Sequence, residues 1–142
     1  MTNAGTVIAN NATLATATGP GTYVIAGGTL DIAQFSSNAT FAVPFATLRI
    51  HALTAAASIT NIRPGDTIDL PGLAATLTGG TLSIGAYTLT LATAPGAAVH
   101  LDTLPTGTRL TALDPLFDPA FYLAHNPDVA ASGIDPYQHF MA

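Results

Sequence analysis

The segments that decide the fold are four short repeats of the pattern Thr–aliphatic–polar–aliphatic. They read T-L-D-I at 29–32, T-L-R-I at 47–50, T-I-D-L at 67–70 and T-L-S-I at 81–84. Such alternation of apolar and polar residues is typical of a strand with one buried face. The first three repeats start 18 and 20 residues apart, which suits the coils of a β-solenoid. The last step, of 14 residues, is too short for a full coil.

Turn signals separate further alternating runs between residues 21 and 113. The turn signals are Gly27-Gly28, Pro64-Gly65, Pro71-Gly72, Gly79-Gly80 and Pro95-Gly96. We therefore expect a mainly β chain with a β-solenoid-like body over residues 21–113. A β-sandwich is the alternative, because its turn signals also recur every 8–12 residues or so. Residues 1–20 are expected to form an N-terminal arm or a first strand.

Residues 114–142 differ from the body and predict a small C-terminal helical module. Four Asx-Pro pairs occur there, and an Asp or Asn at the N-cap followed by Pro at the first helical position favours a helix start. The expected caps are Asp114, Asp118, Asn126 and Asp135. The module also holds five of the ten aromatic residues of the chain: Phe117, Phe121, Tyr122, Tyr137 and Phe140. We expect these rings to cap the β body, either of the same chain or of another copy, and we assign them to self-association.

The composition limits the classes of function. Only 8% of residues are charged, against about 25% in typical soluble domains, and the chain has no Lys, no Glu and no Cys. The net charge of -5 argues against nucleic acid and anionic lipid as partners. No apolar run reaches the length of a membrane span, so membrane insertion is not expected. The first ten residues lack basic and apolar regions, so we expect no cleavable signal peptide in this chain.

The sequence offers no arrangement typical of an enzyme or of a metal site. Asp66 and Asp69 lie three residues apart, but calcium needs six or more oxygen ligands. The four histidines, at 51, 100, 125 and 139, lack the helical spacing of zinc enzymes. No G-x-S-x-G motif is present, and Cys is absent. We therefore expect no enzyme activity, no catalytic or metal-binding residues and no cofactor, with calcium as a candidate that nothing local supports.

Two stretches carry a family resemblance. Residues 117–131, 133–136 and 139–140 resemble a helical module with the pattern F-D-x-x-Y-Y-L-x-x-N-P-D-V-A, found in large bacterial extracellular proteins of RTX-like and S-layer-like type. Residues 59–70 resemble the I-x-x-[FI]-x-x-G-D-x-I-D-L phrase of secreted bacterial β-repeat proteins and adhesins. The resemblance implies an extracellular or cell-surface setting and supplies no catalytic residues. The calcium-binding G-G-x-G-x-D repeat of RTX proteins is absent.

These features together predict a bacterial extracellular structural protein. Soluble β-proteins protect open strand edges with Lys or other charges, and this chain has few. We therefore expect copies to associate head to tail into a fibre or surface layer, with an adhesive or biofilm-type role. The alternative is a monomeric glycan-binding module of a larger secreted adhesin or enzyme, with Tyr23 and Tyr87 as contacts for a cell-surface glycan.

Overall fold

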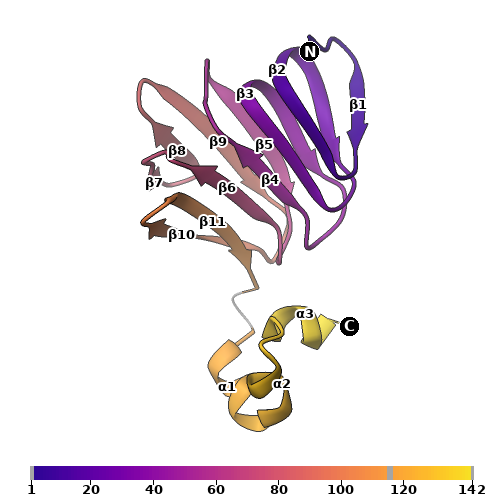
Figure 1. Cartoon of the computed structure of the whole chain (residues 1–142), viewed down its shortest axis with the longest axis vertical. Helices are drawn as coiled ribbons and strands as arrows, with labels where there is room; N and C mark the ends of the chain where they lie inside the picture. The colour runs from indigo at the N-terminus through magenta and orange to yellow at the C-terminus, as the bar shows by residue number, and fades with distance from the viewer. Residues whose placement is uncertain (1, 115–116, 142) are drawn as a thin grey trace.

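A computed structural model describes residues 2–114 and 117–141, in which the chain forms a β-solenoid followed by three short helices (Figure 1). The strands form a nearly closed sheet of about 4 turns. Successive coils pair mainly in parallel, whereas the sheets of a β-sandwich are antiparallel. The β-solenoid prediction is therefore confirmed, and the β-sandwich alternative does not hold.

The described residues form eleven strands, joined by turns and loops, up to residue 113. The strands are β1 (Thr6–Ala9), β2 (Ala12–Ile25), β3 (Thr29–Phe41), β4 (Thr47–Ile50), β5 (Ala57–Ile62), β6 (Thr67–Pro71), β7 (Thr76–Thr78), β8 (Thr81–Ile84), β9 (Tyr87–Thr93), β10 (Ala98–Leu104) and β11 (Gly107–Leu113). The helices are α1 (Pro119–His125), α2 (Pro127–Ser132) and α3 (Pro136–Met141).

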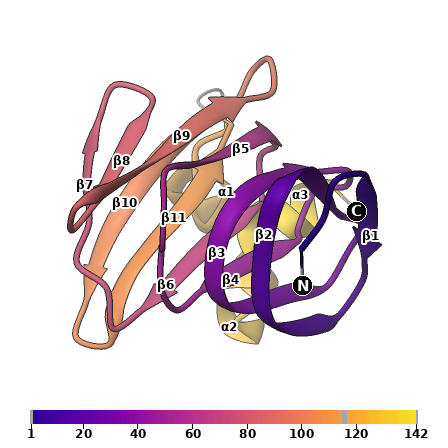
Figure 2. The same cartoon turned by 90° about the horizontal axis from the view of Figure 1, so that it is seen from above.

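The strands form two stacks on either side of the interior (Figure 2). Stack A contains, in spatial order, the first half of β2, the first half of β3, β4, β6, β11 and β10. Stack B contains β1, the second half of β2, the second half of β3, β5, β9, β8 and β7. The strands β2 and β3 are long because each continues from stack A into stack B.

Three of the four sequence repeats lie in register in stack A. Residues 29–32 pair with residues 47–50, and residues 47–49 pair with residues 67–69, all in parallel. Their aliphatic side chains point inward and are buried. The fourth repeat, at 81–84, is strand β8 of stack B and runs antiparallel to β9. Its short spacing follows from this position, because β7, β8 and β9 form an antiparallel meander at the end of stack B and β8 does not begin a coil of its own.

An apolar interior between the stacks holds the fold together. Its largest fully buried side chains are Tyr23, Phe35, Phe41, Ile25, Leu30, Ile32, Leu48, Ile50, Ile59, Ile62, Ile68 and Leu70. Burying one large aliphatic or aromatic side chain stabilises a fold by about 1.5–3 kcal/mol. The described residues leave no buried side-chain nitrogen or oxygen without a hydrogen-bond partner. The interior therefore supplies most of the stability in a chain that has few charges.

One corner of the coil depends on the left-handed backbone region. Asn11 has φ 52°, and Gly28, one coil further on, has φ 59°. The side chain of Asn11 accepts a hydrogen bond from the backbone N–H of Thr29 at 3.0 Å. A Cβ atom at position 28 would collide with the Asn11 side chain. Glycine at 28 thus permits both the backbone conformation and the stacked asparagine.

The N-terminal residues belong to the first coil. Asn3 is buried, its backbone N–H donates to Thr18 O at 2.8 Å, and its side-chain Nδ2 donates to Thr22 O at 3.1 Å. Strand β1 pairs with the end of β2. The boundary expected between residues 20 and 21 falls inside β2, so the described part of 1–20 is continuous with the body. At the other end, β11 stops at Leu113, where the body was expected to end.

The helical module lies below the flank of the solenoid in the view of Figure 1. Its Tyr137 ring contacts the ring of Phe45 in the turn between β3 and β4, with centroids 5.8 Å apart. Phe45 has φ 60°, and its ring lies against Gly65, where a Cβ atom would collide with it. Gly65 therefore leaves room for the ring on which the module docks.

Candidate interaction surfaces

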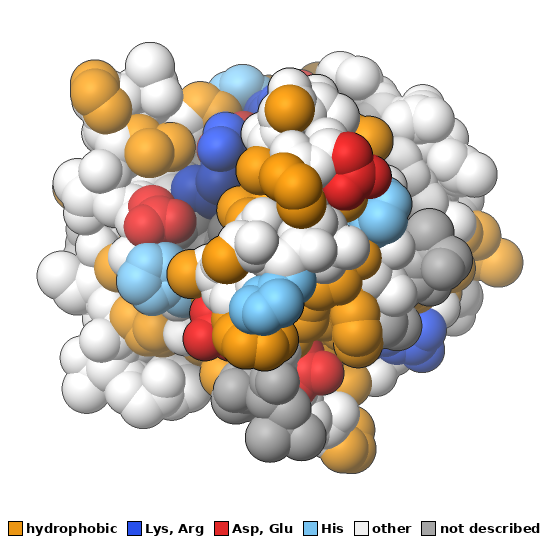
Figure 3. All heavy atoms as spheres, turned by 90° about the horizontal axis from the view of Figure 1, so that it is seen from below, with side chains coloured by type: hydrophobic (Ala, Val, Ile, Leu, Met, Phe, Trp, Pro, Cys, Tyr) orange, Lys and Arg blue, Asp and Glu red, His pale blue; other side chains and the backbone are white. Residues whose placement is uncertain are grey.

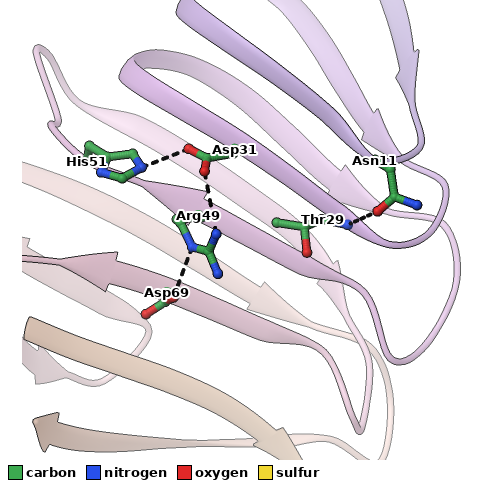
Figure 4. A network of polar contacts seen from close by, with 6 residues as sticks. All are labelled: Asn11, Thr29, Asp31, Arg49, His51 and Asp69. Atoms are coloured by element: carbon green, nitrogen blue, oxygen red, sulfur yellow. Dashed lines mark hydrogen bonds and ion pairs between the residues drawn. The ribbon is translucent and has the colours of Figure 1, made fainter. Parts of the chain in front are cut away.

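A row of alternating charges crosses the outer face of stack A (Figure 4). Asp31, Arg49 and Asp69 occupy directly opposed positions on β3, β4 and β6. The Arg49 guanidinium lies 3.5 Å from Asp31 Oδ2 and donates from Nε to Asp69 Oδ2 at 3.1 Å. This hydrogen bond to Asp69 raises the pKa of Arg49 above its ordinary value. His51 Nε2 lies 2.8 Å from Asp31 Oδ1.

The row continues onto the terminal hairpin of stack A. Arg109 on β11 is directly opposite Asp69, with Nε 4.0 Å from Oδ1, and Asp102 on β10 is opposite Arg109. His100 Nε2 lies 3.0 Å from Asp102 Oδ1. Opposite charges on adjacent strands stabilise their pairing. The row is suited to holding coils in register, since each carboxylate already faces a cation or a histidine.

Asp66 and Asp69 do not form a common site. Asp69 points outward in the charge row, where Arg49 covers much of its side chain, whereas Asp66 is fully buried at the coil corner. The Asp66 carboxylate accepts backbone hydrogen bonds from Ala46 at 3.0 Å and Arg63 at 2.9 Å. Burial raises the pKa of Asp66 to about 6, against the lowering effect of these two hydrogen bonds. Asp66 therefore ties the corner between β5 and β6 to the preceding coil.

The histidines are dispersed over the molecule. His51 and His100 belong to the charge row, while His125 Nδ1 lies 2.9 Å from Phe121 O and His139 Nδ1 lies 2.7 Å from the Tyr122 hydroxyl. Within residues 2–114 and 117–141, no group of three or more His, Cys, Asp or Glu side chains could hold a metal ion.

Two of the four expected cap residues accept a hydrogen bond from a backbone N–H in the first turn of a helix. Asp118 accepts from Phe121 N at 3.1 Å at the start of α1, and Asp135 accepts from Gln138 N at 2.8 Å at the start of α3. Asn126 precedes α2 without a side-chain capping bond, and its Nδ2 donates to Tyr122 O at 2.8 Å. The carbonyl oxygen of Asp114 accepts a hydrogen bond from Phe117 N at 3.0 Å, and the helix start expected after Asp114 lies outside the described residues.

The module aromatics pack mainly on one another. Phe117 contacts Tyr122, Tyr137 and Phe140, with ring centroids between 5.0 and 5.5 Å apart. Tyr137 is buried, so its ring is a contact within the chain and offers no surface to a second copy. Phe121 and Phe140 remain 63% and 53% exposed, and are the two rings of this set best placed for a partner.

A hollow of about 320 Å³ opens on the same face of the module. Its walls are the side chains of Asp114, Phe117, Asp118, Phe121, Tyr122 and Phe140. Seen from below, hydrophobic side chains lie beside Asp and His side chains on the face that carries the module (Figure 3). Aromatic rings bind the apolar face of a ligand, and neighbouring carboxylates bind its hydroxyl or cationic groups. A ligand that has both kinds of group would fit such a hollow. The sequence shows that these aromatic and acidic residues are present, but it does not show that they line one hollow.

The two tyrosines expected at a glycan site have different positions. Tyr23 is fully buried between the stacks, and this burial raises its pKa. Its ring is a core residue and cannot stack on a sugar, so that assignment is corrected. Tyr87 is the first residue of β9 and is 42% exposed. The two rings therefore do not share a surface.

Both ends of the solenoid present strand edges. At the N-terminal end, β1 pairs with β2 alone among the described residues, and Ile8 on β1 is 73% exposed. At the C-terminal end, the outermost strands are β7 in stack B and β10 in stack A, each paired on one side only in the described part of the chain. Apolar side chains at both ends pack on the core but are only partly buried: Val7, Ala12, Leu14, Leu77, Val99 and Leu101.

Searches against family models, curated proteins and solved structures find no match to this chain. None of the helices in the described residues is long and apolar enough to cross a membrane. The fold alone assigns the chain to a class, that of a β-solenoid with a small helical module.

Proposed function

We propose that this chain is a bacterial extracellular structural protein that self-associates into a fibre or surface layer. The observation that carries the proposal is the pair of open solenoid ends. In the described residues β1 at one end, and β7 and β10 at the other, each pair on one side only, and apolar side chains near them are only partly covered. A strand edge of this kind is a template for pairing with another chain.

The distribution of charge supports contact between copies. Residues 1–113 contain three Arg and four Asp, a formal charge of -1 with His neutral. Strands β1 and β7 and the first half of β2 contain no charged residue. On β10, Asp102 is accompanied by His100. The ends therefore lack the repulsive charges with which most β-proteins protect their edges.

The extracellular setting rests on sequence features. The helical module at 117–140 resembles modules of large bacterial extracellular proteins, and the body contains no Cys that a change of redox compartment would affect. The adhesive role follows from the same resemblance. A fibre or layer with these properties acts through packing and edge pairing and does not need a reactive site.

Oligomeric state tests this function directly. Size-exclusion chromatography with light scattering, followed by negative-stain electron microscopy, should show species larger than one chain that grow with concentration. A chain that stays monomeric at high concentration, in the absence of denaturant, would refute self-association.

A second candidate function is glycan binding by the helical module. The specific observation is the hollow of about 320 Å³ with four aromatic walls and two aspartates. Aromatic faces stack on sugar rings, and carboxylates accept hydrogen bonds from sugar hydroxyl groups. Binding on a glycan array that is lost in Phe121→Ala but retained in Tyr87→Ala would support the module as the site. Equal loss in both variants, or no binding by the natural chain, would contradict it.

A further inference from the structure

The helical module carries most of the negative charge of the chain. Four of the eight aspartates lie in residues 114–142, which contain no Lys and no Arg. Residues 1–113 have a formal charge of -1 with His neutral, so the module accounts for -4 of the net charge of -5. The module therefore attracts a positively charged ligand and repels an anion.

Two of the module aspartates line the hollow of about 320 Å³. Asp114 is half-buried there, whereas Asp118 is exposed. Asp118 Oδ1 accepts the capping hydrogen bond from Phe121 N at 3.1 Å, so the start of α1 fixes this carboxylate at the wall of the hollow. A carboxylate can accept about four hydrogen bonds, so the capping bond leaves acceptor capacity for a ligand.

A second hollow, of about 240 Å³, shares Asp114 and Phe117 with the first. Its walls also include Asp135 and Tyr137. Burial, and next the charge of Asp114, raise the pKa of Tyr137. Three of the four module aspartates thus line two adjoining hollows, and their negative charge acts on the rings between them.

Four aromatic rings complete the walls of the larger hollow: Phe117, Phe121, Tyr122 and Phe140. The ring centroid of Phe117 lies 5.5 Å from that of Tyr122 and 5.0 Å from that of Phe140. The face of an aromatic ring attracts a cation, and several rings around one hollow suit an ammonium group that carries methyl groups. A metal ion fits less well, because calcium takes six to eight oxygen ligands and only two carboxylates line the hollow.

We propose that the larger hollow binds an organic cation, an ammonium group that carries methyl or methylene groups. The rings contact the apolar groups of the ligand, and Asp114 and Asp118 balance its charge. This inference goes beyond self-association and narrows the second candidate function, on whose hollow it rests. A glycan that binds there would be an amino sugar with a free amine.

Choline and its neutral isostere dimethylbutanol, in which a carbon atom replaces the nitrogen, test the need for charge. Saturation-transfer NMR on the ligand methyl signal measures binding of each to the full chain, whether the chain is single or assembled. We expect choline to bind at least about fivefold more tightly than the isostere. Added salt should weaken the binding of choline alone. Equal binding of the two probes would overturn the proposal, because the hollow would then be only an apolar surface.

Two matched substitutions locate the site. Asp118→Asn removes one charge from the hollow and keeps the helix cap, because Asn caps a helix about as well as Asp. It should weaken choline binding at least about threefold. Asp128→Asn removes the same charge from the first turn of α2, outside the walls of both hollows, and should leave binding unchanged. Equal losses in the two variants would show attraction to the net charge alone and would refute a local site.

The aromatic contribution and the source of the ammonium group need two further comparisons. Phe121→Leu keeps an apolar side chain but removes the ring face at a position that is 63% exposed, so it should weaken choline and spare the isostere. Glucosamine that binds more tightly than N-acetylglucosamine would identify an amino sugar as the source. Equal binding of the two sugars would overturn the requirement for charge and leave glycan binding standing. Binding of neither choline nor glucosamine would overturn the proposal and leave self-association standing.

Discussion

The stability of the solenoid should fall as pH rises from about 4.5 to about 7.5, because of one buried carboxyl group. Asp66 is fully buried, and its pKa is raised from 3.8 to about 6 by burial. The folded chain therefore binds the proton at Asp66 more tightly than the unfolded chain does. Stability is highest below the unfolded pKa and is lost as pH rises through the folded value.

The magnitude follows from the size of the pKa shift. One pKa unit corresponds to about 1.4 kcal/mol, so the full shift corresponds to about 3 kcal/mol. Part of it is already lost at pH 4.5, which lies above the unfolded pKa. The free energy of unfolding should therefore drop by about 2 kcal/mol between pH 4.5 and pH 7.5.

Asp66→Asn isolates this effect. The amide is neutral throughout the range, so the variant should lose the Asp66 part of the pH dependence. It should also be less stable overall by about 1–3 kcal/mol, because its NH₂ group faces a backbone N–H that the carboxylate had bonded. His51 and His100 each lie beside an aspartate, and both contacts are present in the variant and in the natural chain. The difference between the two pH dependences therefore reports on position 66.

Urea unfolding followed by far-ultraviolet circular dichroism measures the effect at several pH values, at protein concentrations low enough to keep chains single. Asp128→Asn, which changes an exposed carboxylate, is the control and should retain the natural slope. A natural chain whose stability is flat or rises with pH would refute the reasoning. The same conclusion would follow if Asp66→Asn kept the full slope.

Three further substitutions test the packing of the chain. Arg49→Ala should cost about 1 kcal/mol in urea unfolding, less at high salt, because it leaves Asp31 and Asp69 without their shared cation at a partly exposed site. Leu48→Ala should cost about 3 kcal/mol in the same assay, because Leu48 is fully buried between the stacks. Phe45→Ala should release the helical module while leaving the strands folded; faster cleavage after residue 113 in limited proteolysis, with unchanged circular dichroism of the body, would show this.

Local patterns predicted the solenoid well where one coil repeats the last. The repeats at 29–32, 47–50 and 67–70 share a residue order because each lies over its predecessor and fills the same interior. The repeat at 81–84 follows the same local rule, since it is also a strand with one buried face. Its place in a hairpin could not be predicted from the pattern. Alternation predicts a strand and which of its side chains are buried, but it does not predict which strand lies beside it.

The tail illustrates the same limit for helices. Asp118 and Asp135 cap helices because capping needs only backbone groups three residues away. Asn126 has the same local context, yet its side chain bonds a carbonyl of the preceding helix. Asn126 both follows α1 and precedes α2, so two sets of free backbone groups compete for its side chain, and the Asx-Pro pattern considers only the second helix.

The sequence by itself determined the β-rich body, the coil spacing and the short helices, because these depend on alternation, turn residues and caps within a few positions. Only the tertiary structure decided that Asp31, Arg49, Asp69, Arg109 and Asp102 form one row, that Tyr23 is buried, and that β1, β7 and β10 each pair on one side only in the described residues. The charge row joins residues up to some 70 positions apart in the sequence. Which of them become neighbours depends on the register with which each coil stacks on the next.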